Sequence, residues 1–545
     1  MSLTHFQKEI YEELLQKPSA GLSLPMGSGK TFISLTTALS NPSTKDSPVL
    51  VIVSKSLLGN WITEINKFFK DIPIEVIHRD FLKDSINNHV LNPKTKIVLT
   101  TSDFVQKAYK DLKIGKEHMH LVYIENNPFD LQEIYYKRSH SPFLKTTTSN
   151  PQSLFFSIKF KCLIIDEVQK FTNPLTNKCR SMSAICASRR IALSGTMFDE
   201  PTPARVLGYH MLIDHPSFPR TLHLATNFVK SENFKGVRST LVVRKTNEMY
   251  TPNKVIEHYI SNKMTADEEL LYVCFKELIT SIHQMIEYDP SAVNRRKFRA
   301  WFLVALCYLR QSLICPIIPL ASIAINIADT NKRSELSELL NKELVKHNMT
   351  EYLNDPSNLM SSRITKVIEN LKKCENEKVI VFTCFRVSLD LTLSQLKKTC
   401  QRPVFTLTAT MSSKKRSLVL EEFKKSSNGV LFLTYELGAE GLNLQFCSTV
   451  MIMDFWWNIQ KTRQAIARVL RTGQLSSVNI YYFTSNTALE EMILSKHKYK
   501  LIASNDLMDS RIKSQKHTMS MKDIVNFINL SQVTQKLQEI TTTTF

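Results

Sequence analysis

The chain has 545 residues, which is long for a single hydrophobic core and predicts two to four compact units. Its apolar content of 43% and charged content of 22% are ordinary for a folded protein and exclude disorder along most of its length. The 70 Lys and Arg against 50 Asp and Glu give a net charge of +20, which favours a polyanionic partner but, taken alone, leaves nucleic-acid binding open.

Short apolar runs alternate with longer helical patterns in two parts of the chain. Nearly continuous apolar runs of this kind are typical of parallel strands that are buried on both faces. In the first part the predicted strands are 49–53, 96–101, 162–167 and 190–195. In the second part they are 378–385, 403–409, 429–435, 449–455 and 477–483. The sequence therefore predicts an α/β protein with two parallel-sheet lobes.

The remaining segments have other patterns. From about 265 to 360 the pattern is helical and apolar, so we predict a helical linker or insertion between the lobes at 251–360. Residues 107–157 show no clear period and predict an insertion into the first lobe. After the N-terminal lobe at 1–250 and the C-terminal lobe at 361–500, we expect a basic tail at 501–545 that contains an amphipathic helix near MKDIVNFINL.

The octapeptide LPMGSGKT at 24–31 joins a short apolar stretch to a helical pattern. Such a loop favours phosphate because its glycines expose backbone N–H groups and the helix N-terminus adds the positive end of its dipole. Lys30 would reach the β- and γ-phosphates of ATP, and the Thr31 hydroxyl would bind Mg²⁺. The residues expected around the phosphates are Met26, Gly27, Ser28, Gly29, Lys30 and Thr31. Leu24 replaces the first glycine of the strict GxxxxGK[ST] pattern, so the motif is less specific.

The next motif, CLIIDEVQ at 162–169, places two adjacent acids at the end of a buried strand. Charges at such a position are costly unless they serve an ion. We predict that Asp166 holds Mg²⁺ and that Glu167 orients and deprotonates the attacking water; the alternative is two acids at the start of a surface turn. The following strand ends in Ser194 and Thr196, whose hydroxyls can couple the nucleotide site to the neighbouring lobe.

The stretch DFWWNIQKTRQAIARVLRTGQ at 454–474 contains Gln464, Arg468 and Arg471 at i, i+4 and i+7 spacing. A helix that begins near Gln460 would place all three on one stripe. Because the planar arginine fork suits phosphate, we predict that both arginines act as arginine fingers on the γ-phosphate and that Gln464 contacts the nucleotide. Taken in isolation, the stretch would favour a solvated basic helix face.

The order of these motifs resembles the superfamily-two helicases, and more closely their Swi/Snf-type branch of double-stranded DNA translocases. The matching segments are LTHFQ, VLVIVSKSLLGNWITE, ELGAEGLNLQ and the gapless match at 454–474. The resemblance implies two RecA-like lobes with a helical insertion between them. It also implies that Gln7 reads adenine and that Gly441 belongs to the nucleotide site. From the residues alone, Trp61 is a core residue of a helix face.

The resemblance extends over most of the chain, through segments that begin at Leu241 and Leu309 and through 478–500. Three positions depart from it: Gln169 replaces the usual histidine, Met197 a proline and Ala409 a glycine. The adjacent Trp456 and Trp457 either fix their helix to its lobe, which we favour, or contact DNA. In its small size and scarce glycine, the chain also resembles compact viral members of the family.

The function implied is a DNA-stimulated ATPase that uses ATP and Mg²⁺ and moves along double-stranded DNA as a monomeric motor. RNA is a second candidate track, so a strand-separating DNA or RNA helicase remains an alternative. A catalytically silent nucleic-acid-binding scaffold is an alternative of another class.

The ten cysteines form no CxxC pair, and the fourteen histidines show no paired metal-ligand spacing. We therefore expect free thiols in a reducing intracellular compartment, with the nucleus or a site of viral replication as the favoured location. The most apolar stretch, 301–328, is interrupted by Arg310 and Gln311, so we expect buried helical core and no membrane association.

Overall fold

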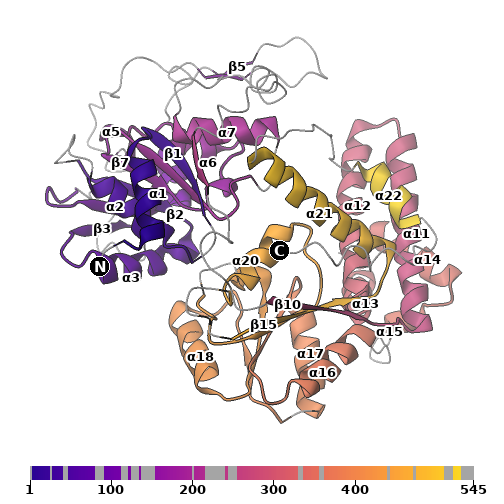
Figure 1. The fold of residues 1–545 in the computed structure, drawn as a ribbon. Helices are drawn as coiled ribbons and strands as arrows, with labels where there is room; N and C mark the ends of the chain where they lie inside the picture. The colour runs from indigo at the N-terminus through magenta and orange to yellow at the C-terminus, as the bar shows by residue number, and fades with distance from the viewer. Residues whose placement is uncertain are drawn as a thin grey trace. The chain divides into compact units, whose positions relative to one another are not determined.

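The fold is known from a computed structural model. It describes residues 3–24, 27–40, 47–79, 91–111, 121–123, 134–136, 154–198, 202–214, 240–243, 255–328, 335–354, 361–399, 401–438, 442–470, 474, 476–508 and 520–529. The chain divides into two compact units, which are described separately (Figure 1). The first comprises Met1–Thr251 with Lys500–Ser514, and the second comprises Pro252–Tyr499 with Gln515–Phe545.

The first unit is built on a seven-stranded sheet in the order β3-β4-β2-β7-β8-β1-β9, in which every neighbouring pair is parallel. The strands are β1 Ser19–Ser23, β2 Val49–Val53, β3 Ile74–Ile77, β4 Ile97–Thr101, β7 Cys162–Ile165, β8 Arg190–Ser194 and β9 Leu241–Val243. The four runs predicted from the sequence form β2, β4, β7 and β8. The other three strands are additional.

Helices cover both faces of this sheet, because successive residues of a strand point to opposite faces. Val49, Val51 and Val53 of β2 belong to the core beneath the first helices, and Leu50 and Ile52 belong to the core on the opposite face. The helices are α1 His5–Leu15, α2 Lys30–Ser40, α3 Leu58–Phe68, α4 Ser102–Asp111, α5 Leu154–Ser157, α6 Asn177–Ser183 and α7 Pro203–Ile213.

Part of the insertion predicted at 107–157 is regular structure. Helix α4 continues to Asp111, and the antiparallel strands β5 Leu121–Tyr123 and β6 Ile134–Tyr136 pair with each other. The segments 112–120, 124–133 and 137–153 lie outside the described residues.

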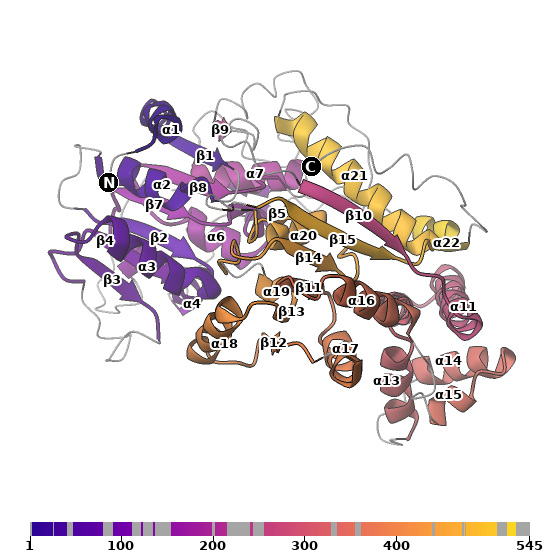
Figure 2. The same cartoon turned by 60° about the horizontal axis from the view of Figure 1, so that its bottom comes forward.

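The second unit contains a six-stranded parallel sheet in the order β10-β15-β14-β11-β13-β12. Its strands are β10 Val255–Ser261, β11 Val379–Thr383, β12 Val404–Thr406, β13 Val430–Thr434, β14 Thr449–Ile452 and β15 Val478–Thr484. The helices that follow or separate these strands are α16 Ser362–Lys373, α17 Arg386–Thr399, α18 Ser413–Lys425, α19 Tyr435–Gly438, α20 Ile459–Ile466 and α21 Ala488–Met508 (Figure 2). All five runs predicted as strands contain one.

The segment predicted as a helical linker or insertion at 251–360 begins with a strand that the sequence reasoning did not identify, because Val255–Ser261 forms the edge strand β10. Aromatic contacts with β15 explain this pairing: His258 stacks on Tyr481 with ring centroids 4.4 Å apart, and Tyr259 stacks on Tyr482 at 5.0 Å. The helices that follow are α11 Ala266–Tyr288, α12 Ala292–Ser312, α13 Ile317–Ala328, α14 Glu335–Lys346 and α15 Glu351–Asn354. Their apolar side chains share one core with the second sheet.

The tail contains α22 Met521–Asn529 where the amphipathic helix is predicted, with Val525 and Ile528 buried in the core of the second unit. The apolar stretch at 301–328 divides between α12 and α13, and Phe302 and Leu309 are fully buried there. Among the described helices, none combines the length and the apolar character that crossing a membrane requires.

Candidate nucleotide-binding site

The phosphate loop follows β1, and α2 begins at Lys30. Gly27 and Gly29 have φ values of 81° and 83°, in the left-handed region that favours glycine. A Cβ at Gly29 would also lie 2.5 Å from Nε2 of Gln7, so the Gln7 side chain would have to move away from the loop. The loop conformation therefore depends on these two glycines. Met26, the predicted neighbour of Gly27, lies outside the described residues.

The polar side chains of the loop are arranged as a phosphate site requires. Lys30 Nζ donates to the carbonyl of Leu24 at 3.0 Å, which holds the ammonium over the loop. The Ser28 hydroxyl is buried and has no hydrogen-bond partner among the described residues. A buried hydroxyl without a partner is costly, so its orientation fits a ligand that accepts a hydrogen bond there.

Gln7, the predicted adenine contact, lies against the same loop. Thr4 caps α1, and Gln7 completes the capping box with its own side chain. The Gln7 Nε2 also donates to the carbonyl of Ser28 at 3.2 Å. The structure thus brings Gln7 to the phosphate loop from 21 residues away.

Asp166 follows the end of β7, and its carboxylate is held by two donors. The indole Nε1 of Trp61 donates to Oδ2 at 2.8 Å, and the backbone N–H of Glu167 donates to Oδ1 at 2.9 Å. Burial, together with the charge of Glu167, raises the pKa of Asp166 to about 6. The carboxylate is therefore preorganised and costly to ionise without a cation.

The contact of Trp61 with Asp166 was not identified by the sequence reasoning. It lies on α3 and is 4% exposed, as a core residue would be, but its N–H reaches Asp166 across 105 residues of sequence. A tryptophan on an apolar helix face gives no sequence signal for this contact.

Glu167 begins a network that leads to the end of β8. Its backbone is left-handed, with φ 50° and ψ 46°, and its carboxylate accepts a hydrogen bond from Gln169 Nε2. Gln169 Oε1 accepts from Ser194 Oγ at 2.7 Å, and Ser194 Oγ accepts from the Thr196 N–H at 2.8 Å. The Thr196 hydroxyl is buried and has no hydrogen-bond partner in the described part of the chain. The amide of Gln169 thus donates to the acid and accepts from Ser194 at the same time.

The described side chains fit ATP and Mg²⁺. The loop offers an unpartnered donor, the acids offer carboxylate oxygen, and Mg²⁺ needs only one or two protein carboxylates when phosphates and water complete its coordination. Within the described ranges no group of three or more His, Cys, Asp and Glu could hold a metal alone.

The second unit departs from the prediction of one helical stripe. Helix α20 ends at Ile466, so Gln464 lies on the helix and Arg468 follows it. The α-helical pattern of hydrogen bonds, each four residues back, stops here. The N–H groups of Arg468 and Val469 instead bond three residues back, to the carbonyls of Ala465 and Ile466. The carbonyl of Arg468 also accepts from the N–H of Leu444 at 3.1 Å.

The side chain of Arg468 is 3% exposed, and its Nε donates to the carbonyl of Gly438 at the end of α19. Arg471 and Gly441, the other two predicted residues of this unit, lie outside the described residues.

The two adjacent tryptophans pack within the second unit. Trp456 meets the ring of Tyr435 at 6.1 Å, and the Trp457 ring lies under the cations of Arg310 at 5.3 Å and Lys496 at 5.6 Å. These contacts agree with the favoured alternative, in which the tryptophans fix this segment to its lobe.

Asp454 lies beside the end of β11. It is 3% exposed and accepts hydrogen bonds from Thr383 Oγ1 at 2.6 Å and from the N–H of Cys384 at 2.8 Å. Burial raises its pKa. Both donors come from β11 and its end, so this carboxylate joins the ends of β11 and β14.

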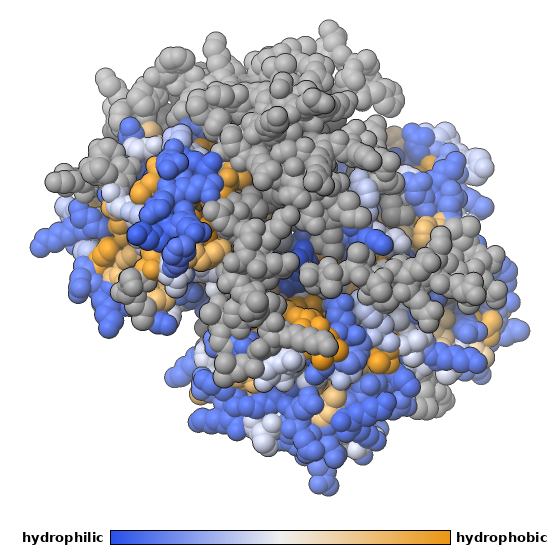
Figure 3. Space-filling view, viewed as in Figure 1, coloured by the Kyte–Doolittle hydropathy of each residue, from blue (hydrophilic) through white to orange (hydrophobic). Residues whose placement is uncertain are grey.

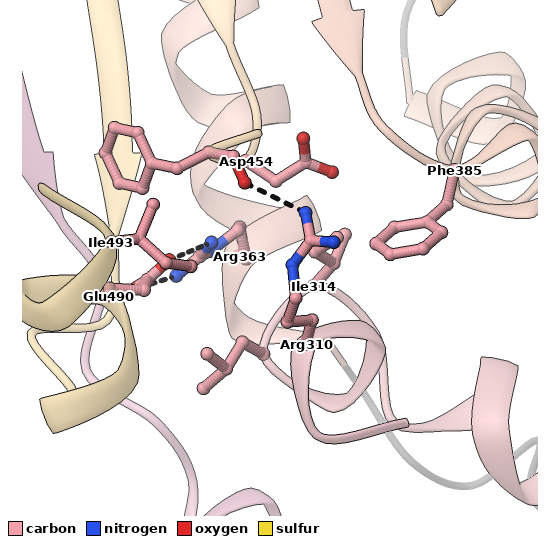
Figure 4. A pocket seen from close by; sticks show the side chains of 9 residues that line it. Arg310, Ile314, Arg363, Phe385, Asp454, Glu490 and Ile493 are labelled. Atoms are coloured by element: carbon pink, nitrogen blue, oxygen red, sulfur yellow. Dashed lines mark hydrogen bonds and ion pairs between the residues drawn. The ribbon is translucent and has the colours of Figure 1, made fainter. Parts of the chain in front are cut away.

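A small pocket beside Asp454 contains the charged residues Arg310, Arg363 and Glu490 (Figure 4). Arg363 is fully buried and forms a two-pronged ion pair with Glu490, with N–O distances of 2.7 and 3.0 Å. Arg310 donates to the carbonyl of Phe455 at 2.9 Å. These interactions join α12, α16 and α21 to the sheet, and no sequence motif identified them.

Comparisons with known proteins agree with this arrangement. A SNF2-related domain model matches residues 13–380, and a helicase conserved C-terminal domain model matches 362–473. A protein of Invertebrate iridescent virus 6 named as a candidate helicase, 172L, is 26% identical over 90% of this chain and 86% of its own length.

A DNA repair and recombination protein RAD54-like of Drosophila yakuba is 24% identical over 67% of this chain, and the chain spans 48% of that relative's length. The SWI2/SNF2 ATPase core of Sulfolobus solfataricus, solved in complex with double-stranded DNA, is 19% identical, covers 98% of both chains and superposes with a TM-score of 0.37. Because the SNF2-related model matches more than half of its length, the chain belongs to the SNF2-related family of helicase-like ATPases.

Proposed function

We propose that this protein is an ATP-dependent, Mg²⁺-requiring translocase on double-stranded DNA that acts in genome maintenance, chromatin or transcription. The observation that supports it best is that Lys30 and the hydrogen-bonded set of Asp166, Glu167, Gln169 and Ser194 lie at one edge of the first sheet. Parallel α/β sheets bind ligands at the carboxyl ends of their strands, where these residues lie.

The roles assigned to the first unit follow from its chemistry. Lys30 and the loop N–H groups bind the β- and γ-phosphates, Thr31 and Asp166 hold Mg²⁺, and Glu167 accepts a proton from the water that attacks the γ-phosphorus. Magnesium, when bound, would neutralise charge on the phosphates. Glu167 is oriented for its role by Gln169, whose amide is fixed in turn by Ser194.

For the second unit we propose that Arg468 and Arg471 stabilise charge on the γ-phosphate and that Gln464 and Gly441 contact the nucleotide. An arginine in this role contributes about 10³- to 10⁵-fold to the rate in related phosphoryl-transfer systems.

The net charge of +20 supports binding to the phosphate backbone of duplex DNA, which predicts sequence-tolerant, salt-sensitive affinity. We further propose that the protein works as a monomer inside the cell, in the nucleus or at a site of viral replication. The free thiols of all described cysteines suit a reducing compartment.

The deciding experiment is ATP turnover with duplex DNA, single-stranded DNA, RNA and no nucleic acid. We expect the largest stimulation with duplex DNA, and we expect Lys30→Ala to lower kcat by about 10²- to 10³-fold because a donor to the transferred phosphoryl group is lost. Turnover that does not rise with duplex DNA, or that survives Lys30→Ala, would show that the proposal is wrong.

Movement on duplex DNA is distinguished from strand separation by a second pair of assays. Displacement of a third strand from a triplex without unwinding of the duplex is the expected result. Unwinding of an oligonucleotide duplex, above all one that contains RNA, would favour the strand-separating helicase.

A further inference from the structure

Three helices of the second unit end in a pair of lysines. The pairs are Lys372–Lys373 at the end of α16, Lys397–Lys398 in the last turn of α17 and Lys424–Lys425 at the end of α18. In each case a buried residue comes directly before the pair, namely Leu371, Leu396 and Phe423. All six lysines are exposed. We call this set the lysine edge.

The topology brings the three pairs to one edge of the sheet. Helices α16, α17 and α18 lead directly into β11, β12 and β13, which are parallel and begin in register at Val379, Val404 and Val430. The helix ends therefore lie at the amino edge of the sheet. Asp454 lies at the opposite, carboxyl edge, beside the ends of β11 and β14.

The helices approach this edge from both faces of the sheet. Leu371 of α16 and Leu396 of α17 belong to the core that contains Val379 and Val381, and Phe423 of α18 belongs to the core on the other face. In Figure 1, α18 lies on one side of the strands in the lower part of the picture, and α16 and α17 lie on the other side. Figure 3, in the same view, shows a predominantly hydrophilic surface in this lower part.

Hydrogen bonds link the three segments that connect α16 to β11, α17 to β12 and α18 to β13. Arg402, just before β12, donates to the carbonyl of Leu371 at 2.7 Å and to that of Asn428, before β13, at 2.9 Å. Lys378, just before β11, donates to the carbonyl of Lys424 at 2.8 Å. The lysine pairs thus stand on a fixed framework and not on separate loops.

On α16 and α18, cations other than the six lysines already bind carbonyls of the last helical turn. Cations are favoured at helix C-termini because they complement the dipole and the free carbonyls. Arg402 and Lys378 already donate to those carbonyls on α16 and α18. Within the described residues, no ion pair or hydrogen bond engages the ammonium group of any of the six lysines.

Acidic neighbours do not neutralise the lysine edge by pairing with it. Glu375, Glu377, Glu421 and Glu422 lie on the same connections and last turns, but none forms an ion pair with the six lysines. The Glu377 carboxylate instead accepts a hydrogen bond from Thr449. Closely spaced, unpaired ammonium groups repel one another, and a polyanion relieves that repulsion.

We propose that the lysine edge is a second DNA-binding surface that contacts the phosphate backbone of duplex DNA. It deepens the proposed function, because it gives the translocase a contact at the amino edge of the second sheet, opposite the edge that holds Asp454. Lysine suits this role, since a flexible point charge binds phosphates without fixing a base sequence.

The test uses the full chain and its equilibrium affinity for duplex DNA without nucleotide, measured over a range of salt concentrations. The slope of log K against log salt is negative, and each phosphate contact contributes about −0.9 to it. Replacing all six lysines with glutamine should make the slope less negative by about 5, and replacing a single pair should make it less negative by about 2. Six arginines at these positions should preserve the slope.

The matched control is the double variant K263Q/K342Q. It removes two exposed lysines of the same unit, one directly after β10 and one on α14, and neither forms an ion pair with described residues. We expect this control to retain the wild-type slope. An unchanged slope in the six-glutamine variant would overturn the proposal. So would a change of slope in the control as large as that of a single lysine pair, or a change of slope that is seen with RNA and not with duplex DNA.

A further measurement distinguishes this inference from the proposed function. Turnover without DNA should be the same in the wild type and the six-glutamine variant, while the duplex concentration needed for half-maximal stimulation should rise at least about tenfold in the variant. If duplex DNA fails to stimulate the wild type, the proposed function is wrong, and the salt slopes still decide whether the lysine edge binds DNA.

Discussion

At the carboxyl edge of the first sheet, Asp166 and Glu167 form no ion pair with any described residue, whereas in the second unit Glu490 is closed by a two-pronged bond from Arg363. Both places are largely buried, and both hold charge. Unpaired carboxylates beside an unpartnered hydroxyl are a preorganised receptor, while a satisfied ion pair fixes the positions of its own helices. The comparison separates a site that needs a ligand from a junction that does not.

The largest effect should come from Glu167→Gln, which keeps the shape of the side chain but removes the proton acceptor. We expect kcat to fall by about 10²- to 10⁴-fold, while ATP binding and the thermal unfolding temperature stay close to the wild type. Turnover and calorimetry would check this. A stable variant with full turnover would end the assignment of Glu167 as general base.

Arg363→Ala should show the opposite pattern, since it leaves Glu490 buried without its partner. Loss of one member of a buried pair costs about 3–5 kcal/mol, so the free energy of unfolding of the second unit should fall by this amount. Denaturant unfolding would measure it. As a control, Lys366→Ala removes one member of an exposed pair with Glu369 and should cost about 0–1 kcal/mol. Equal losses of unfolding free energy in Arg363→Ala and Lys366→Ala would show that the buried pair does not fix the positions of its helices.

Gln169→Ala tests whether the network behind Glu167 positions the base. The change leaves Ser194 Oγ without its buried acceptor, which costs about 1–3 kcal/mol, and it frees the Glu167 carboxylate. We expect kcat to fall more than the Michaelis constant rises, and we expect Gln169→His to recover part of the rate. A change in the Michaelis constant alone would mean that Gln169 serves binding.

The sequence predicted those parts of the site that are contiguous in the chain. LPMGSGKT and DEVQ each place their groups within a few residues, so spacing alone locates Lys30 and Asp166. The links from Trp61 to Asp166 and from Ser194 to Gln169 cross 105 and 25 residues, and only the sheet order brings them together. Periodicity could not place the end of α20 either, because the change from hydrogen bonds four residues back to bonds three residues back at Arg468 and Val469 leaves no signal in the apolar pattern.

The same lesson applies to the fold. Buried strands such as β2 and β11 are visible as apolar runs, since both of their faces are covered. The edge strand β10 is half-exposed and depends on stacking against β15, so its sequence does not resemble theirs. Likewise, the lysine edge consists of three short pairs about 25 residues apart, and they become one surface only through the register of three strands.

The smallest effect, and the sharpest test of the receptor, comes from Trp61→Phe. The ring stays in the core, but the indole N–H that favours ionised Asp166 is lost, so the pKa of Asp166 should rise above about 6. Because we assign Mg²⁺ binding to the ionised carboxylate, the acidic limb of the kcat/KM profile should move to higher pH, with little change in turnover near pH 8.

Asp166→Asn tests the direction of the pKa shift of Asp166 through protein stability. A raised pKa means that ionising Asp166 destabilises the nucleotide-free fold as pH rises from about 4 through 6, so this variant should unfold at a higher temperature than the wild type at pH 8 and lose that advantage below about pH 4. An unmoved acidic limb in Trp61→Phe would show that the indole only packs, and that Asp166 is oriented by the backbone of Glu167 alone.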